Sequence, residues 1–231
     1  MNNNQFTRLK LLIGNNSFKS INNLKVLVLG LGGVGSYVVE ALVRSGVGTI
    51  VLVDFDKIDI TNLNRQLMTN LNNIGCLKTD VIEKRILEIN PNVKIIKINK
   101  YINEDNINIL FDIKVDYLID CCDALDTKKA VIKECLKRKI KFISCMGTGK
   151  KLDPSKLKII DLRKTTYDPL AKKLRKWLSD EKINGKVLCC SSTEPSLKMA
   201  SNIIGSAVFV PASAGLLIAS YVVRDVINDE R

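Results

Sequence analysis

Short apolar runs along this chain alternate with longer amphipathic stretches. The apolar runs, rich in β-branched residues, predict strands near residues 25–30, 49–53, 93–98, 115–120 and 140–145. The amphipathic stretches predict helices near residues 33–46, 78–90, 104–111 and 126–138. Strands that alternate with helices are typical of a doubly wound, largely parallel sheet. We therefore expect an α/β, Rossmann-like fold, with an antiparallel extension built from apolar runs near residues 157–163 and 186–191.

The chain has 231 residues and contains no internal repeat, low-complexity block or long linker. This length suffices for one domain with a sizeable core, so we expect a single domain over residues 1–231. Within it, residues 1–24 are expected to form an N-terminal helical arm. Residues 148–231 are expected to form an extension on the substrate side that ends in a terminal helix.

The stretch from Ile203 to Val223 runs for 21 residues without a charge, which is long enough to span a membrane. Several serines and Pro211 dilute it, and the sheet needs a final helix to cover it. We therefore predict a buried terminal helix, or a helix pair broken before Pro211, in preference to a membrane span. Peripheral association with a membrane stays an alternative.

A glycine cluster separates the first predicted strand from the first predicted helix, and Asp54 closes the next strand 24 residues after Gly30. In nucleotide-binding βαβ units, such glycines make the turn, let the backbone approach phosphate, and let helix and strand pack closely. An acid about 20 residues further on binds the ribose. The sequence therefore predicts a nucleotide site whose phosphate-binding loop contains Gly30, Gly32, Gly33 and Gly35.

The residues after Asp54 bear on which nucleotide is bound. Most units of this kind bind NAD or FAD, so an oxidoreductase is the first alternative. However, Asn62, Arg65 and Lys78 follow the ribose acid, and such side chains suit a triphosphate whose charge they neutralise. Asp123 follows a further apolar run and offers a hard oxygen ligand that suits magnesium. The pattern therefore favours ATP with Mg²⁺ over a dinucleotide.

These motifs resemble those of the ThiF/MoeB/HesA superfamily of ubiquitin-activating-like adenylyltransferases. The matching segments are Gly30–Gly35, Val53–Asp56, Thr61–Gln66, Lys78 and Asp120–Asp123. The resemblance implies that Asp54 binds the ribose of ATP and that Asp123 binds magnesium. It implies that Asn62, Arg65 and Lys78 contact the phosphates, and it adds Asp56 and Gln66 to the ATP-binding set. The resemblance also implies a homodimer in which Arg8 reaches the partner's ATP.

Segments of the second half resemble one branch of this superfamily, the tRNA threonylcarbamoyladenosine dehydratases. These segments are Gly147–Gly149, Leu152–Pro154, Ile160–Thr165, Asp168–Ala171 and Cys190–Glu194. The resemblance implies ATP-dependent dehydration, by cyclisation, of threonylcarbamoyladenosine next to the anticodon of tRNA, through an acyl-adenylate. More weakly, it implies a sulfur-transfer partner from a cysteine desulfurase system.

The formal net charge of +12 suits a polyanionic partner such as tRNA. Asp168 and Pro169 read as the N-cap and first residue of a helix whose other faces carry most of a basic cluster. Such a face can lie along a phosphate backbone, although a solvated amphipathic helix is the plainer interpretation. Trp177 lies in the apolar stripe and is expected as a core anchor. The candidate tRNA-binding residues are Arg163, Lys164, Lys172, Lys173, Arg175 and Lys176.

The seven cysteines and the absence of an N-terminal apolar signal segment favour free thiols in a reducing cytosol. We expect a cytoplasmic protein, with a peripheral membrane location as the alternative. No Cys-x-x-Cys pair and no histidine occur, so we predict no structural zinc. Four cysteines in apolar runs are expected to be buried: Cys121, Cys122, Cys135 and Cys145. Cys189 and Cys190 are the better candidates for reactive thiols, although packing is favoured for them too.

The absence of histidine excludes Ser-His-Asp and Cys-His catalysis. It is compatible with adenylation, because a carboxylate nucleophile is already ionised at neutral pH and needs no base. Two other functional classes stay open at this point. One is adenylation of the C-terminal glycine of a ubiquitin-like sulfur carrier, and the other is a non-catalytic nucleotide- or tRNA-binding module.

Overall fold

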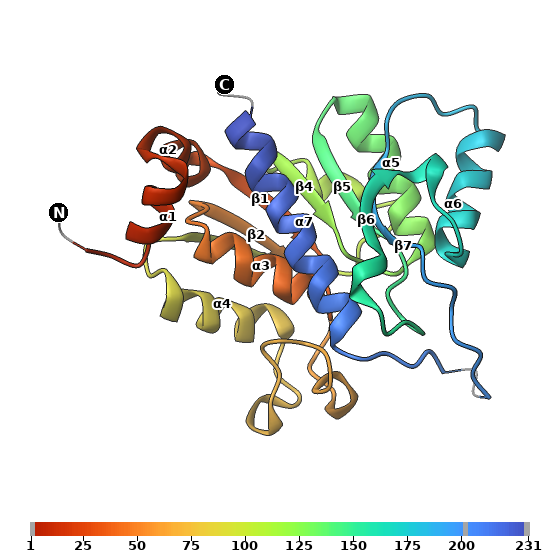
Figure 1. Ribbon diagram of the computed structural model, residues 1–231, viewed down its shortest axis with the longest axis horizontal. Helices are drawn as coiled ribbons and strands as arrows, with labels where there is room; N and C mark the ends of the chain where they lie inside the picture. The colour runs from red at the N-terminus through yellow and green to blue at the C-terminus, as the bar shows by residue number, and fades with distance from the viewer. Residues whose placement is uncertain (1–2, 201–202, 229–231) are drawn as a thin grey trace.

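The computed structural model describes residues 3–200 and 203–228, and its centre is a seven-stranded sheet (Figure 1). The strand order is β3-β2-β1-β4-β5-β7-β6, and every neighbouring pair is parallel except the antiparallel pair β6–β7. The predicted α/β fold with an antiparallel extension is therefore confirmed. The strands are β1 (Lys25–Leu29), β2 (Thr49–Val53), β3 (Lys94–Ile98), β4 (Tyr117–Asp120), β5 (Lys141–Cys145), β6 (Leu157–Asp161) and β7 (Leu188–Ser192).

Helices cover both faces of this sheet, and each face has its own hydrophobic core. One core joins the sheet to α2, α3, α4 and α7, and the other joins it to α5 and α6. β1 and β2 lie between the two cores, so their residues are apolar at almost every position, as expected for strands buried on both faces. The helices are α1 (Thr7–Ile13), α2 (Asn15–Asn23), α3 (Gly35–Arg44), α4 (Lys78–Ile89), α5 (Leu125–Arg138), α6 (Pro169–Asp180) and α7 (Phe209–Asn228).

The α-helix expected near residues 104–111 is wrong, because the chain forms only a 3₁₀-helix at Ile107–Leu110. Two asparagine side chains explain the difference. Asn103 accepts a hydrogen bond from the backbone N–H of Asn106, and Asn106 accepts one from the backbone N–H of Asn103. Local side-chain bonds of this kind compete with the helical hydrogen-bond ladder, so the apolar spacing alone is not sufficient to form an α-helix here.

The charge-free stretch forms one helix, α7, which lies across the near face of the sheet in Figure 1. The prediction of a terminal helix packed on the sheet is confirmed, and the alternative of a helix pair is wrong because α7 begins at Phe209 and includes Pro211 in its first turn. A first-turn proline removes no helical hydrogen bond. Gly215 lets α7 approach α3, because a Cβ there would lie 2.5 Å from the carbonyl oxygen of Val34. Within the described residues, α7 is also the one helix long and apolar enough to cross a membrane.

Candidate functional site

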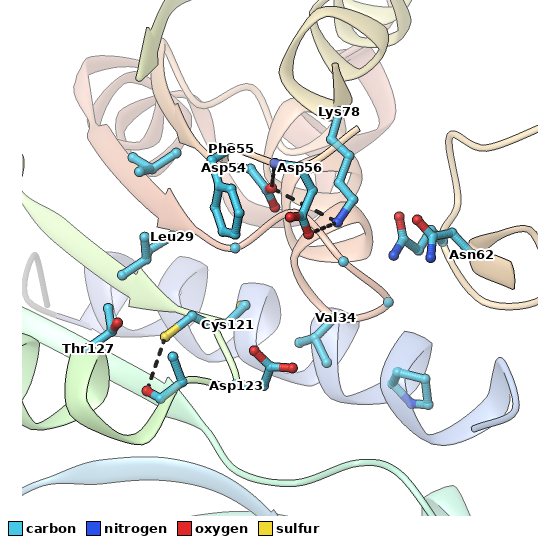
Figure 2. Close-up of a pocket in the computed structure, with 18 of the residues that line it drawn as sticks. Leu29, Val34, Asp54, Phe55, Asp56, Asn62, Lys78, Cys121, Asp123 and Thr127 are labelled. Atoms are coloured by element: carbon cyan, nitrogen blue, oxygen red, sulfur yellow. Dashed lines mark hydrogen bonds and ion pairs between the residues drawn. The ribbon is translucent and has the colours of Figure 1, made fainter. Parts of the chain in front are cut away.

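A cavity of about 510 Å³ opens at the carboxyl ends of β1, β2 and β4 (Figure 2). This edge is where open α/β sheets bind ligands, because the loops after neighbouring parallel strands meet there. The glycine loop comes from β1, the acids Asp54 and Asp56 from β2, and Asp123 from β4. Strand order brings these three loops together, since β1 lies between β2 and β4.

The glycine loop lies close to the loop after β4. Gly30 has φ +85°, and a Cβ there would lie 2.8 Å from the backbone nitrogen of Cys122. At Gly35 a Cβ would lie only 1.9 Å from the carbonyl oxygen of Gly30, so glycine is required where α3 begins. Gly30, Gly32 and Gly33 line the cavity, whereas Gly35 is not among the lining residues. Of the four predicted glycines, three therefore face the cavity and Gly35 acts through packing.

Asp54, Asp56 and Lys78 form one connected group on the β2 side of the cavity. The Asp54 carboxylate accepts hydrogen bonds from the backbone N–H groups of Leu31, at 2.6 Å, and Asp56, at 2.8 Å. Lys78 begins α4 and donates to Asp56 Oδ2 at 2.6 Å, while its Nζ lies 3.9 Å from Asp54 Oδ1. The lysine expected to contact phosphate is therefore held by carboxylates and directed into the cavity.

Asn62, Arg65 and Gln66 come from the segment that includes the 3₁₀-helix Ile60–Asn62, and all three line the cavity. Asn62 Oδ1 accepts a hydrogen bond from the backbone N–H of Asp59 at 3.2 Å. Arg65 donates to the carbonyl oxygen of Thr61 at 2.8 Å. Gln66 is buried, and its Oε1 has no hydrogen-bond partner among the described residues. These bonds orient the side chains while leaving polar atoms for a ligand.

Asp123 enters the cavity from the side opposite to Lys78, on the loop that follows β4 (Figure 2). A buried group lies beneath this loop. Asp120 Oδ2 accepts hydrogen bonds from Lys128 Nζ at 2.9 Å and from Ser144 Oγ at 2.6 Å, and Asp120 Oδ1 accepts one from the backbone N–H of Cys122 at 3.1 Å. The side chains of Lys128 and Asp120 are fully buried. This group ties the loop that carries Asp123 to α5 and β5.

Sequence reasoning missed the Asp120–Lys128–Ser144 group. One feature of the sequence could have indicated it: Lys128 precedes the apolar Val131 and Ile132 by three and four residues, which places it on the apolar face of α5. Burial by itself lowers the pKa of Lys128, but the charge and hydrogen bond of Asp120, together with the neighbouring Cys122 and Cys145, outweigh burial and raise that pKa above its usual value. Lys128 therefore stays protonated, and the buried charges compensate each other.

The cysteines near the cavity are packing residues, but two of them are less buried than predicted. Cys121 and Cys122 were expected to be buried, but they are half-buried and line the cavity, because β4 ends at Asp120 and leaves them in the loop. Burial raises the pKa of both thiols. Cys189 and Cys190 are buried in β7. Burial raises the pKa of Cys189, and a hydrogen bond with Cys145, followed by burial, raises the pKa of Cys190. These environments favour protonated thiols at neutral pH.

The loop after β3 adds Lys100, Tyr101 and Ile102, which no motif indicated, whereas Phe55 lies in the matching segment Val53–Asp56 after β2. Phe55 and Tyr101 pack edge to face at the cavity, with ring centroids 5.1 Å apart, and Lys100 and Ile102 lie beside them. Thr127 at the start of α5 donates to the carbonyl oxygen of Ile102 at 2.7 Å and fixes this loop. These residues come from distant parts of the chain, so no sequence spacing joins them.

Arg8 is exposed on α1 and is not among the residues that line the cavity of its own chain. The structure does not bring it to the other predicted site residues of the same protomer. This placement is compatible with the predicted action on a partner's site but does not test it.

The basic cluster divides into two groups. Arg163 donates to the carbonyl oxygens of Gly185 and Ile183, each at 2.8 Å, and Arg175 donates to Thr165. The remaining four cations are exposed and have no ion pair among the described residues: Lys164, Lys172, Lys173 and Lys176. Asp168 caps α6 and Pro169 is its first residue, as predicted. Trp177 is half-buried against the second core, so its interpretation as an anchor is confirmed.

Comparisons with known proteins give a consistent result. The ThiF family matches residues 4–224. The tRNA threonylcarbamoyladenosine dehydratase of Bacillus subtilis is 40% identical, over 97% of this chain and 95% of the relative. Crystal structures of the Escherichia coli tRNA N6-threonylcarbamoyladenosine dehydratase, TcdA, in complex with AMP and with ATP superpose with a TM-score of 0.93 at 33% identity, covering 98% of this chain and 95% of theirs.

Proposed function

The chain belongs to the ThiF family, and on this premise we propose that it is an ATP-dependent tRNA threonylcarbamoyladenosine dehydratase. The substrate is threonylcarbamoyladenosine next to the anticodon, and the product is its cyclic, dehydrated form. The observation that carries the proposal is the similarity to dehydratases over almost their whole length, combined with a cavity whose glycine loop, acids and cations suit ATP. The alternative of a ubiquitin-like carrier as substrate is not favoured.

The residues present fit ATP. The backbone approaches the cavity at Gly30, Gly32 and Gly33, where phosphate oxygens can accept hydrogen bonds from the loop. Backbone hydrogen bonds position the Asp54 carboxylate, whose oxygens can accept hydrogen bonds from the ribose hydroxyls. On ATP binding, Lys78 moves from Asp56 toward the triphosphate. Water can then solvate Asp56, because its side chain is 46% exposed. Asn62 and Arg65 complete the phosphate contacts.

A magnesium ion fits one side of the same cavity. The described residues contain no group of three or more His, Cys, Asp or Glu side chains that could hold a metal by themselves. Magnesium commonly binds through one or two carboxylates together with the phosphates of its nucleotide, so the single carboxylate of Asp123 is an adequate protein ligand. When bound, the ion would neutralise phosphate charge.

The reaction needs positioning and charge stabilisation from the protein. The threonyl carboxylate of the substrate attacks the α-phosphorus of ATP, and the bond to pyrophosphate breaks. Arg65 and Lys78 stabilise the charge that moves to the pyrophosphate. The neighbouring carbamoyl nitrogen or oxygen then attacks the activated acyl carbon, AMP leaves and one proton is released. The net change in the nucleoside is the loss of one water.

A homodimer is part of the proposal, with Arg8 acting on the ATP of the other protomer. Exchange between two inactive variants tests it. Arg8→Ala and Asp123→Ala protomers each lack one function, but a mixed dimer has one site with both residues intact. We expect activity to reappear when the two variants are mixed and allowed to exchange. No recovery, with mixed dimers present, would show that Arg8 does not act in trans. The sulfur-transfer partner stays a prediction.

The central test compares AMP release from ATP and magnesium with threonylcarbamoyl-modified tRNA and with unmodified tRNA. We expect release only with the modified tRNA, alongside loss of one water from the nucleoside by mass spectrometry. Asp123→Ala should abolish release, and surviving activity would count against its magnesium role. Release that requires a carrier protein, with none for either tRNA, would overturn the dehydratase assignment and favour the carrier alternative.

A further inference from the structure

Tyr167 is an exposed aromatic residue on an unusual backbone. Its φ is +57°, in the left-handed region that bulky side chains rarely adopt, and its side chain is 65% exposed. In the part of the chain that the structure describes, its hydroxyl makes no hydrogen bond. Packing therefore does not explain this residue, and strained positions of this kind are frequent at functional sites.

The neighbours of Tyr167 are held on both sides. Arg175 donates to the carbonyl and hydroxyl oxygens of Thr165, two residues before it. Asp168, the next residue, caps α6 by accepting a hydrogen bond from the backbone N–H of Ala171 at 2.7 Å. Because both flanking residues are fixed, the chain between them presents the tyrosine ring to solvent. Arg175, which the sequence predicts as a tRNA contact, thus also supports this turn within the protein.

The turn lies next to the nucleotide cavity. Asp168 packs against Gly147, where a Cβ would lie 2.9 Å from Asp168 Oδ2. The residue after Gly147 is Thr148, which lines the cavity. Tyr167 therefore precedes a residue, Asp168, that contacts the Gly147–Thr148 loop at the edge of the nucleotide cavity. A ring at this place can meet a part of the substrate that stays outside while the reacting group is inside.

The charges around Tyr167 indicate the chemistry of that part. Lys164 precedes it, and Lys172 and Lys173 follow in the first turns of α6; all three are exposed. The N-terminus of α6 is capped by the Asp168 carboxylate, so the positive charge near Tyr167 comes from these lysines. An aromatic face among cations suits single-stranded nucleic acid, whose bases stack on the ring while the phosphates meet the lysines.

We propose that Tyr167 is a stacking site for an unpaired nucleobase of the substrate RNA, next to the nucleotide that reacts. Lys164, Lys172 and Lys173 contact the flanking phosphates. This inference rests on the proposed function, since it takes the substrate to be an anticodon loop. It assigns a substrate contact to a residue outside the ATP-binding set.

Two variants separate the ring from the backbone. Tyr167→Asn removes the ring and suits the left-handed conformation, so the fold is retained. Tyr167→Phe keeps the ring and removes only the hydroxyl, and is the matched control. We expect Tyr167→Asn to weaken binding of threonylcarbamoyl-modified tRNA by about 5- to 150-fold, which is the usual range for loss of one base stack. The KM for ATP should not change, and Tyr167→Phe should bind within about twofold of the parent protein.

A paired change in the RNA identifies the stacked base. Modified anticodon stem-loops with an abasic site on either side of the reacting nucleotide are compared on the parent protein and Tyr167→Asn. If one abasic site weakens binding to the parent but not to Tyr167→Asn, the ring and that base contact each other. If the parent protein dehydrates modified tRNA but Tyr167→Asn and Tyr167→Phe bind this tRNA equally well, the inference is overturned and the proposed function stands. Failure of the parent to act on modified tRNA would instead overturn the proposed function.

Discussion

Two lysine–aspartate groups lie at the carboxyl ends of β2 and β4, the two strands that flank β1, and differ in their surroundings. Lys78 pairs with Asp56 after β2, and Asp56 is 46% exposed toward the cavity and solvent. Lys128 pairs with Asp120 at the end of β4, and both side chains are fully sealed from solvent. The first lysine can replace a solvated partner by phosphate. The second cannot leave its partner, because an uncompensated charge would remain in a water-free interior.

The comparison shows that lysine and aspartate can bind the ligand at one place in the site and stabilise the backbone around it at another. Lys78 and Asp123 face the cavity, whereas Asp120 and Lys128 hold the backbone from which Asp123 projects. The difference lies in desolvation rather than in bond length, since the lysine–carboxylate distances are 2.6 Å and 2.9 Å. Three predictions follow this difference, from the largest effect to the smallest.

Lys128→Met should lower the free energy of unfolding by about 3–5 kcal/mol, because it leaves Asp120 charged and buried. Urea denaturation measures this change. The double variant Asp120→Asn with Lys128→Met removes both charges and keeps an acceptor for the backbone N–H of Cys122, so it should recover most of the loss. A loss below about 1 kcal/mol in Lys128→Met would mean that the sealed pair behaves like a surface pair.

Lys78→Met should act on activity more than on stability. We expect kcat/KM for ATP-dependent AMP release to fall by about 10²- to 10³-fold, because a group that stabilises transition-state charge is lost. The free energy of unfolding should fall by less than in Lys128→Met, because Asp56 is 46% exposed and can be solvated, and only Asp54, 3.9 Å from Lys78 Nζ, is left buried. Asp56→Asn removes the charge that pairs with Lys78 and keeps the lysine, so it should lower kcat/KM by less than Lys78→Met. A large loss of stability with little loss of activity would reverse the roles of the two lysines.

Glu40 provides the intermediate case, away from the cavity. Its carboxylate on α3 pairs with Arg44 at 2.7 Å and with Arg85 of α4 at 2.9 Å, and both arginines are largely solvated. Burial raises the pKa of Glu40, but hydrogen bonds from Arg85 and Arg44 outweigh burial and lower the pKa below its usual value near 4.5. We expect Glu40→Gln to cost less than about 1 kcal/mol at neutral pH.

The pH dependence of that cost follows from the direction of the shift. A folded-state pKa below the unfolded value means that the unfolded chain binds the proton first as pH falls. The contribution of Glu40 is therefore present above the unfolded pKa and is lost as pH falls through the folded pKa. Urea denaturation of the parent and Glu40→Gln at descending pH should give curves that converge in acid. A difference that grows in acid would contradict the lowered pKa.

Particular elements show how far sequence patterns extend. The strands and the antiparallel pair β6–β7 followed from apolar runs, because a buried strand needs apolar residues wherever it is placed. The helix expected near residues 104–111 failed because two asparagine side chains bound the backbone instead. Phe55 and Tyr101 could not be paired from sequence, since they meet only when the loops after β2 and β3 are adjacent.

The sequence by itself determined the order of strands and helices, the glycine turn, and the identities of the acids and cations that could bind a nucleotide. These features depend on residues close together in the chain, where local conformation and apolar spacing decide the result. Only the tertiary structure decided which lysine was sealed and which faced the cavity. Burial of Lys128 depends on β5 lying beside β4 and on α5 covering both, and this arrangement joins residues that are far apart along the chain.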